Sequence, residues 1–243
     1  MTTAKFNSIL FDFDGTLSTI DGIEFLAELK GVSEKVKSLA IRNKNTYSVS
    51  ADLYRRRLEC SQPHLRDIDQ LIAAYKRALL PGVKQTFHWL HGLNKDIYII
   101  SGGIKNALIP VGELLGVSAE RIFAVELEFD GQGNMIGFDS TSPRTDVGGK
   151  KQLIASLRLQ RPSVLIGDGT NDVAARDSVD QCIGFGGVEY RPLIEEHCEW
   201  YVRDPAIITV LPAILTQEEL SEVRKNWINQ LSQKNAKTQE VLF

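Results

Sequence analysis

The sequence predicts an α/β protein: a Rossmann-like, doubly wound parallel sheet with a small helical cap inserted after the first strand. Short apolar runs recur along the chain, and each is followed by turn-forming residues and a helical pattern, as in βα units. Residues 14–96 separate the first two runs, which is too long for a single crossover. With 243 residues, 43% of them hydrophobic, the chain can bury a sizeable core.

The apolar runs and the helical periodicity give the expected elements in order. We expect strands at residues 8–13, 97–101, 121–125, 163–167 and 182–185, with a short sixth strand at 201–202. Helical patterns in the long interval cover residues 23–29, 34–43, 51–59 and 65–79. Residues 129–138 indicate a β-hairpin with its turn at 130–134. Thr216 and Glu219 form a capping-box pattern that begins a polar helix running towards Gln233.

These elements divide the chain into three parts. Residues 1–17 and 82–215 are expected to form the catalytic core, residues 18–81 the helical cap domain, and residues 216–243 a C-terminal helix and tail.

Composition excludes several classes of function and partner. The net charge is −3 and the basic residues are scattered, so we expect no nucleic-acid partner. The three cysteines, Cys60, Cys182 and Cys198, have no CxxC spacing, which argues against a disulfide framework and a zinc site and favours a reducing cytosol. No membrane helix or signal peptide is recognisable, so we expect a cytoplasmic, membrane-free protein. The sequence leaves the oligomeric state open.

Asp12 and Asp14 stand where the first apolar run gives way to Gly15 and Thr16. If the strand continues through them, both side chains leave the same face. Alone, such a pair is about as often one helix-capping and one solvated carboxylate as it is part of a functional site. The rest of the chain has to decide between these explanations.

Two further carboxylates, Asp168 and Asp172, follow the strand expected at 163–167. Open α/β sheets bind ligands at the carboxyl ends of their strands. We therefore expect Asp12, Asp14 and Asp168 to form a cluster of oxygen ligands, which suits Mg²⁺.

An anion site and a cation complete the predicted active site. Ser101, Gly102 and Gly103 are expected to offer a hydroxyl and free backbone N–H groups at a helix N-terminus. Alone, this triplet would more often be an ordinary strand-to-helix turn. Lys150 precedes the helix that leads to the Asp168 strand and could neutralise a phosphate and its attacking aspartate.

Together these residues suggest a phosphatase that works in two displacements. Asp12 attacks phosphorus to form an aspartyl phosphate, while Asp14 first donates a proton to the leaving oxygen and later activates water. Mg²⁺, Lys150, Ser101 and backbone amides would spread the charge on the phosphoryl oxygens.

The same residues resemble the haloacid dehalogenase superfamily. Its four motifs correspond here to Asp12-x-Asp14-Gly15-Thr16, Ser101, Lys150 and Gly167-Asp168-Gly169-x-x-Asp172. The resemblance covers about residues 8–205. It implies that Asp12, Asp168 and the backbone carbonyl of Asp14 bind Mg²⁺ and that Asp172 supports the metal shell.

Within the superfamily, the chain looks most like the phosphoserine phosphatases of serine biosynthesis. That similarity implies that Asp21 holds the substrate amine, where glutamate is usual, and that Arg57 holds the substrate carboxylate. Asn171, inside the fourth motif, is expected to contact the substrate with Ser101 and its neighbouring glycines. Residues 43–50 replace the small and apolar stretch that is usual in that family.

The implied substrate is L-phosphoserine, with another small phosphorylated metabolite as the alternative. A solvated helix face remains the alternative for Arg57, which ends a run of three arginines. A phosphomutase and an inactive metabolite-binding protein are the competing functions. A phosphomutase would return the phosphoryl group to a substrate hydroxyl, and a pure binder would be insensitive to Asp12→Asn.

Overall fold

Six parallel strands form the central sheet in the order β3-β2-β1-β6-β7-β8. The computed structural model describes residues 5–41, 51–139 and 148–240. The strands of this sheet are β1 (Ser8–Phe11), β2 (Asp96–Ile104), β3 (Ile122–Val125), β6 (Ser163–Gly167), β7 (Gln181–Phe185) and β8 (Trp200–Val202). All six predicted strands are therefore confirmed, and so is the doubly wound parallel architecture.

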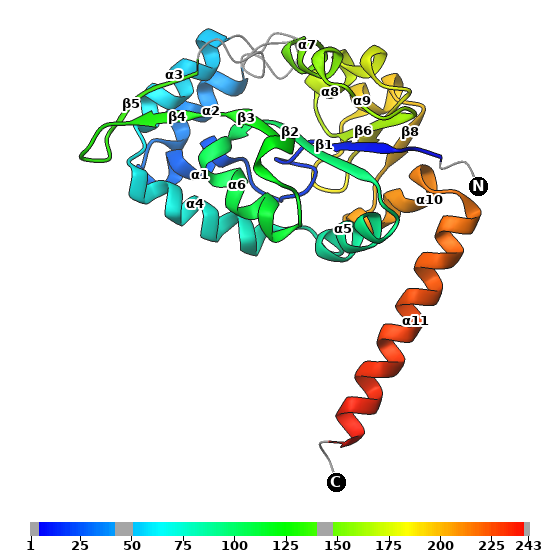
Figure 1. Ribbon diagram of the computed structural model, residues 1–243. Coiled ribbons are helices and arrows are strands. Elements are labelled where there is room, and N and C mark those ends of the chain that lie inside the picture. The colour runs from blue at the N-terminus through cyan, green and yellow to red at the C-terminus, as the bar shows by residue number, and fades with distance from the viewer. Residues whose placement is uncertain (1–4, 42–50, 140–147, 241–243) are drawn as a thin grey trace.

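Helices cover both faces of this sheet (Figure 1). Helices α5 (Val83–Gly92) and α6 (Lys105–Leu114) lie on one side, and α7 (Gly149–Ser156), α8 (Thr170–Ala174) and α9 (Pro192–His197) lie on the other. Short α10 (Leu211–Ile214) connects the domain to α11 (Gln217–Glu240).

Both faces of the sheet are apolar because both are covered. Along β1, Ile9 and Phe11 join the larger hydrophobic cluster, whereas Leu10, between them, joins the smaller cluster on the other face. Period-two alternation thus divides one continuous apolar run between two cores.

The expectation that the second strand ends at Ser101 is wrong. β2 continues to Ile104, and α6 begins at Lys105. The register between β2 and β3 shifts after Ile100, and Ile104 pairs with Val125 beyond the shift. The Ser101-Gly102-Gly103 segment is therefore an extended, irregular part of the strand, not a turn at a helix N-terminus.

Four helices follow β1 and lie together beyond one end of the sheet (Figure 1). These helices, which we call the helical insertion, are α1 (Gly22–Leu29), α2 (Ser33–Ile41), α3 (Ala51–Ser61) and α4 (Leu65–Ala78). Each coincides with a predicted helical pattern. Residues 42–50, which include the whole atypical stretch 43–50, lie outside the described residues.

The predicted hairpin forms a separate two-stranded sheet, β4 (Leu127–Phe129) and β5 (Met135–Phe138). It contacts the helical insertion at two places. The backbone N–H of Leu65 donates to the Gly133 carbonyl at 2.8 Å, and the rings of Tyr54 and Phe138 lie 5.5 Å apart.

Helix α11 begins with the predicted capping box: the Glu219 N–H donates to Thr216 Oγ1 and the Thr216 N–H donates to Glu219 Oε2. Buried Lys95 pairs with Glu219 and anchors this first turn to the core. The helix then projects away from the domain, on the side opposite to α1–α4, and continues beyond the predicted end to Glu240 (Figure 1).

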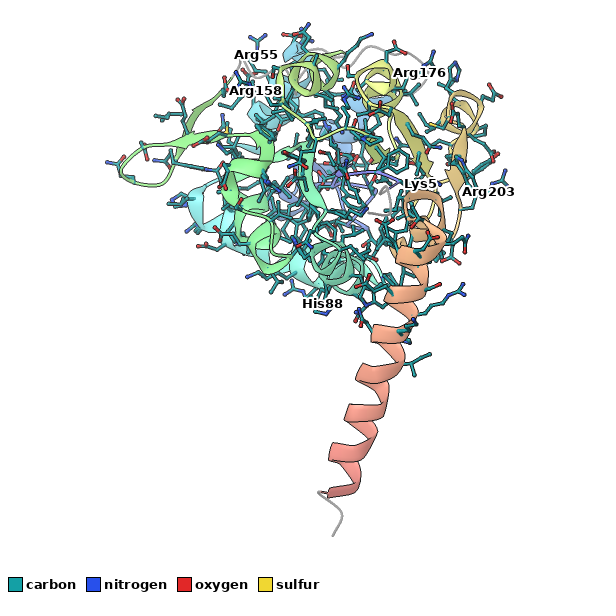
Figure 2. All side chains as sticks on the ribbon, turned by 45° about the vertical axis from the view of Figure 1, so that its right-hand side comes forward. Lys5, Arg55, His88, Arg158, Arg176 and Arg203 are labelled. Carbon is teal, nitrogen blue, oxygen red and sulfur yellow. The ribbon has the colours of Figure 1, made fainter. Side chains whose placement is uncertain are left out.

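Figure 2 labels basic side chains at several places around the domain, among them Arg55, His88 and Arg203. Arg55 pairs with Asp52, and Arg203 pairs with Glu195. The absence of a nucleic-acid partner stays a prediction. In the part of the chain that the structure describes, no helix has the length and apolar character of a membrane span.

Candidate active site

Three carboxylates meet at the carboxyl ends of β1 and β6. Phe11 is in register with Ile166, so Asp12 and Asp168 emerge side by side where the two strands end. Side-chain oxygens of Asp12, Asp168 and Asp172 all lie within 4.8 Å of one another. All three side chains are almost completely buried. This cluster is the centre of the candidate site.

The cluster differs in composition from the expected one. β1 ends before Asp12, so Asp12 and Asp14 do not project from one strand face. The Asp14 carboxylate is turned towards Tyr75 and Gly22, and Asp172 takes the third place.

Lys150 supplies the cation in the centre of the site. From the first turn of α7, its Nζ lies 2.5 Å from Asp172 Oδ1 and 3.1 Å from Asp12 Oδ1. Burial would lower the pKa of Lys150, but the two carboxylates outweigh it and raise that pKa above its usual range. Burial raises the pKa of Asp172 to about 6, despite the opposing effect of Lys150. Lys150 is therefore a permanent cation beside the predicted nucleophile.

Asp168 is held by groups from two segments, the residues after β1 and the loop after β7. Thr16 Oγ1 donates to it at 3.3 Å, and the guanidinium of Arg191 lies 3.2 Å from its Oδ2. Gly15 has φ +80°, and a side chain there would collide with Asp168. Burial and the charge of Asp12 raise the pKa of Asp168 well above its usual value, although Arg191 opposes them.

Asp14 lies next to the cluster in a separate environment. Its Oδ1 accepts a hydrogen bond from Tyr75 at 2.7 Å, and its Oδ2 accepts one from the Gly22 N–H at 3.2 Å. Burial, with the charge of Asp21 added, raises the pKa of Asp14 well above its usual value. A protonated Asp14 fits the general acid expected from the sequence.

Ser101 and Gly103 border Asp14 from β2. The Ser101 hydroxyl is buried and accepts the Gly103 N–H at 3.0 Å. A Cβ at Gly103 would lie 3.1 Å from Asp14 Oδ2, so the backbone passes close to the acid. Gly102 lies between them, half-buried.

The two residues assigned to substrate recognition contact each other. Arg57 on α3 places its Nη2 3.3 Å from Oδ1 and 3.4 Å from Oδ2 of Asp21, which also caps α1. Glu24 Oε1 lies 3.8 Å from the same nitrogen. Arg57 is largely buried against the helical insertion, so the solvated-face alternative is not what the structure shows for this arginine.

Sequence reasoning missed Tyr75, Glu24 and Arg191. Tyr75 matched the apolar face of a helix, Glu24 matched an exposed helical position, and Arg191 follows Asp168 by 23 residues outside any motif. A cation soon after the carboxyl end of a strand was the available signal for Arg191.

The donor groups of the cluster have the chemistry of a metal site. Three buried carboxylates offer hard oxygen ligands, and Lys150 and Arg191 are the nearby cations that face them. The pKa of Asp168 is raised by burial and by repulsion from Asp12, and a cation would relieve that repulsion. This arrangement fits a small divalent metal ion. Asn171, on the adjacent turn of α8, has a buried Oδ1 with no hydrogen-bond partner among the described residues.

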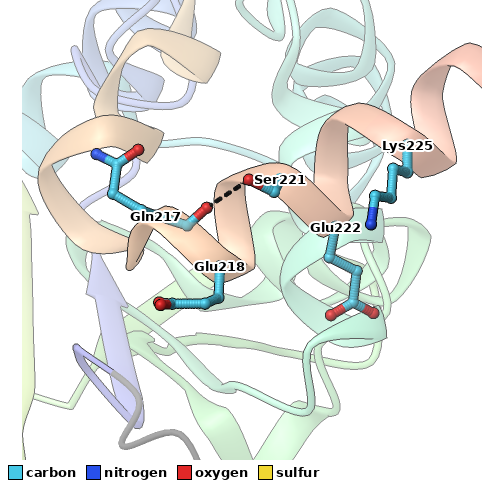
Figure 3. A pocket seen from close by; sticks show the side chains of 5 residues that line it. All are labelled: Gln217, Glu218, Ser221, Glu222 and Lys225. Carbon is cyan, nitrogen blue, oxygen red and sulfur yellow. Dashed lines mark hydrogen bonds between the residues drawn. The ribbon is translucent and has the colours of Figure 1, made fainter.

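A hollow of about 500 Å³ lies along the first turns of α11 (Figure 3). It is lined by Gln217, Glu218, Ser221, Glu222 and Lys225. One helix supplies all of its lining, and the helix leaves the domain away from α1–α4, so this hollow is separate from the aspartate cluster.

Known proteins share both sequence and fold with this chain. The family model of haloacid dehalogenase-like hydrolases matches residues 9–176. Phosphoserine phosphatase of Homo sapiens is 31% identical over 201 residues, which is 82% of this chain and 89% of that protein.

Two solved structures have a similar fold. A substrate-bound complex of phosphoserine phosphatase has a TM-score of 0.71 at 22% identity, covering 86% of this chain and 98% of that chain. A phospho-aspartyl intermediate analogue of phosphoserine phosphatase has a TM-score of 0.70 at 23% identity, with the same coverage of 86% and 98%.

Proposed function

Since this chain belongs to the haloacid dehalogenase-like hydrolase family and is a phosphatase, we propose that it hydrolyses L-phosphoserine to L-serine and phosphate with Mg²⁺. The observation that carries this proposal is the position of Lys150 between Asp12 and Asp172. A buried cation beside the attacking carboxylate neutralises the charge of an incoming phosphate.

In the first displacement, Asp12 attacks phosphorus through a carboxylate oxygen. The bond from phosphorus to the serine oxygen breaks, and Asp14 gives its proton to that oxygen. In the second displacement, Asp14 takes a proton from water as the water oxygen attacks the aspartyl phosphate. Inorganic phosphate leaves, and Asp12 and protonated Asp14 are regenerated.

Asp12, Asp168 and the backbone carbonyl of Asp14 are the proposed ligands of Mg²⁺, with Asp172 supporting them. The ion would supply positive charge to the phosphoryl oxygens when bound. Asp172 also holds the ammonium of Lys150 at 2.5 Å. Its role in this chain is therefore to position a cation as well as to serve the metal site.

The phosphoryl oxygens are proposed to bind Ser101, Asn171 and the backbone amides of Gly102 and Gly103. The Gly103 N–H, which donates to Ser101 Oγ at 3.0 Å in this structure, would exchange that partner for phosphate. The amide NH2 of Asn171 can donate to a phosphoryl oxygen, whereas its buried Oδ1, unpaired among the described residues, needs a donor.

Residues 18–81 are the proposed cap, residues 1–17 and 82–215 the core, and residues 216–243 a C-terminal extension. In the cap, Asp21 and Arg57 form an opposite-charge pair close to Asp14. A substrate that carries both an ammonium and a carboxylate can replace each partner of this pair with one of its own charges. This possible exchange supports the proposal that the substrate is an amino-acid phosphate such as phosphoserine.

We also propose a reducing compartment such as the cytosol, because the three cysteines are free. A relative, phosphoserine phosphatase of Arabidopsis thaliana, is chloroplastic, so fractionation of cells should test this expectation.

The test of the function is phosphate release from a panel of phosphomonoesters with Mg²⁺. L-phosphoserine should exceed phosphoethanolamine, which lacks the carboxylate, and 3-phosphoglycerate, which lacks the amine. Asp12→Asn should abolish release while the protein stays folded. Equal rates on all esters would refute the assignment of L-phosphoserine as the substrate. Full activity of Asp12→Asn would refute the role of Asp12 as the nucleophile.

A further inference from the structure

Tyr75 is a buried phenol that the catalytic motifs do not include. It lies on α4, near the end of the helical insertion, and is fully buried. Its hydroxyl lies 2.7 Å from Asp14 Oδ1, a short and direct hydrogen bond between the insertion and the predicted acid.

The surrounding packing fixes this hydroxyl in place. The Tyr75 ring packs edge-on against Phe13 at 4.9 Å, next to Asp14 in sequence. At Gly22 on α1, a Cβ would lie 2.2 Å from the Tyr75 oxygen, so glycine leaves just enough room for the phenol. Since the ring and the hydroxyl are both confined, Tyr75 has little freedom to release Asp14.

The hydrogen bond also distinguishes the two oxygens of Asp14. Because the Tyr75 hydroxyl occupies Oδ1, Oδ2 is the oxygen left to exchange a proton with the substrate or with water. The Gly22 N–H contact to Oδ2 is longer, at 3.2 Å. Oδ2 is also the oxygen that faces Gly103 of β2, because a Cβ there would lie 3.1 Å from it. Gly103 belongs to the segment proposed to bind phosphate.

We propose that Tyr75 is a positioning residue for the hydrolysis: it holds Asp14 so that Oδ2 carries and delivers the proton. This inference rests on the proposed function, since it assigns Tyr75 to the acid and base steps of that reaction. The same bond orients Asp14 when it accepts a proton from water. Tyr75 itself touches Asp14 and need not touch the substrate.

Tyr75→Phe removes the hydroxyl and keeps the ring against Phe13. Tyr98→Phe is the matched control, because Tyr98 is a half-buried tyrosine on β2 that packs with the smaller hydrophobic cluster. Wild type and both variants are compared on L-phosphoserine, whose alkoxide leaves poorly, and on 4-nitrophenyl phosphate, whose phenolate leaves without protonation.

On L-phosphoserine, kcat of Tyr75→Phe should fall about 10-fold or more, with KM within about twofold of wild type. On 4-nitrophenyl phosphate, the initial burst should keep its wild-type rate, because the first step needs no acid. Steady-state turnover should still fall, because water activation needs the base, and acid quenching should trap more aspartyl phosphate. In an Asp14→Asn background, Tyr75→Phe should have no further effect.

If Tyr75 had a purely structural role, Tyr75→Phe would slow both displacements equally, and it would lower activity further in the Asp14→Asn background. Either result would overturn the inference. Unchanged kinetics of Tyr75→Phe would also overturn it. If Tyr75→Phe is too unstable, Gly22→Ala provides a second test, because its methyl displaces the hydroxyl without deleting it, and the same leaving-group dependence is expected. Absence of turnover in wild type on every ester would overturn the proposed function together with this inference. Active wild type with normal Tyr75→Phe kinetics would overturn the inference alone.

Discussion

The ammonium group of Lys150 lies 3.1 Å from the carboxylate of Asp12, although 137 residues separate the two positions in the chain. The same nitrogen lies 2.5 Å from Asp172. One side chain therefore joins the carboxyl end of β1 to the first turn of α8 across the centre of the site. The predictions for Lys150 and for divalent metal follow from this arrangement of buried charges.

Replacing Lys150 should affect both catalysis and stability. Lys150→Met should lower kcat by about 100-fold or more, because a cation that faces the transferred phosphoryl group is lost. Without divalent metal, the free energy of unfolding should fall by about 3–5 kcal/mol, because two buried carboxylates lose their partner. Urea unfolding and phosphate release measure these effects. Lys151→Met, which removes an exposed neighbour paired with Asp177, is the control and should change neither quantity appreciably.

Divalent metal should stabilise the folded protein as well as activate it. Mg²⁺ binding would relieve the repulsion between Asp12 and Asp168, and binding to the folded state alone raises the midpoint of thermal unfolding. We expect a rise in Tm with Mg²⁺ in wild type, its reversal by chelator, and its loss in Asp168→Asn. Asp177→Asn, at an exposed carboxylate, should retain the rise. A Tm independent of Mg²⁺ in wild type would contradict the metal assignment.

The central strands were predictable because they are apolar on both faces, as Ile9, Leu10 and Phe11 illustrate. The four sequence motifs likewise predicted which residues meet, because the motifs follow parallel strands whose carboxyl ends share one edge of the sheet. The path at Ser101 was not predictable in this way. Whether a glycine pair turns or extends depends on pairing with β3, which local sequence does not encode.

Partners of site residues were the least predictable part. Tyr75 repeats the helical apolar pattern of α4, and that pattern carries no information about what its hydroxyl contacts. Arg191 reaches Asp168 from a loop after β7, and Asp21 meets Arg57 across 36 residues. Such contacts depend on the tertiary arrangement of separate elements, which periodicity and spacing do not specify.

Asp67 should make the stability of the helical insertion depend on pH. It accepts the His64 N–H at the start of α4 and lies 2.5 Å from the Lys30 ammonium. Burial would raise the pKa of Asp67, but these partners outweigh it and lower that pKa below 3.8. A depressed folded-state pKa gives stability that is present above the unfolded pKa and lost as pH falls through the folded one.

Asp67→Asn should therefore cost about 1 kcal/mol of unfolding free energy at pH 7. The difference from wild type should persist to about pH 5 and shrink below about pH 4. Urea unfolding at pH 7, 5 and 3 measures it. Asp69→Asn, at an exposed position of the same helix, is the control, and a difference that grew at low pH would contradict the assignment.

Arg57 should determine the preference for a carboxylate-bearing substrate. Its guanidinium is largely buried, faces Asp21 and Glu24, and has an Nε without a hydrogen-bond partner among the described residues. A substrate carboxylate can use that free donor and replace Asp21, so its loss should cost a charged hydrogen bond of about 1.5–3 kcal/mol. Arg57→Ala should then lower kcat/KM for L-phosphoserine by about 10- to 100-fold, mainly through KM.

The same variant should change kcat/KM for 4-nitrophenyl phosphate by less than about twofold, because that ester has no carboxylate to lose. Arg56→Ala is the matched control, since Arg56 is exposed on the same helix and pairs with Asp52. If Arg57→Ala weakened both esters equally, Arg57 would be supporting the cap rather than reading the substrate. If Arg57→Ala lowered kcat/KM for neither ester, the substrate carboxylate would have to bind elsewhere. The proposed replacement of Asp21 by a substrate carboxylate would then be wrong.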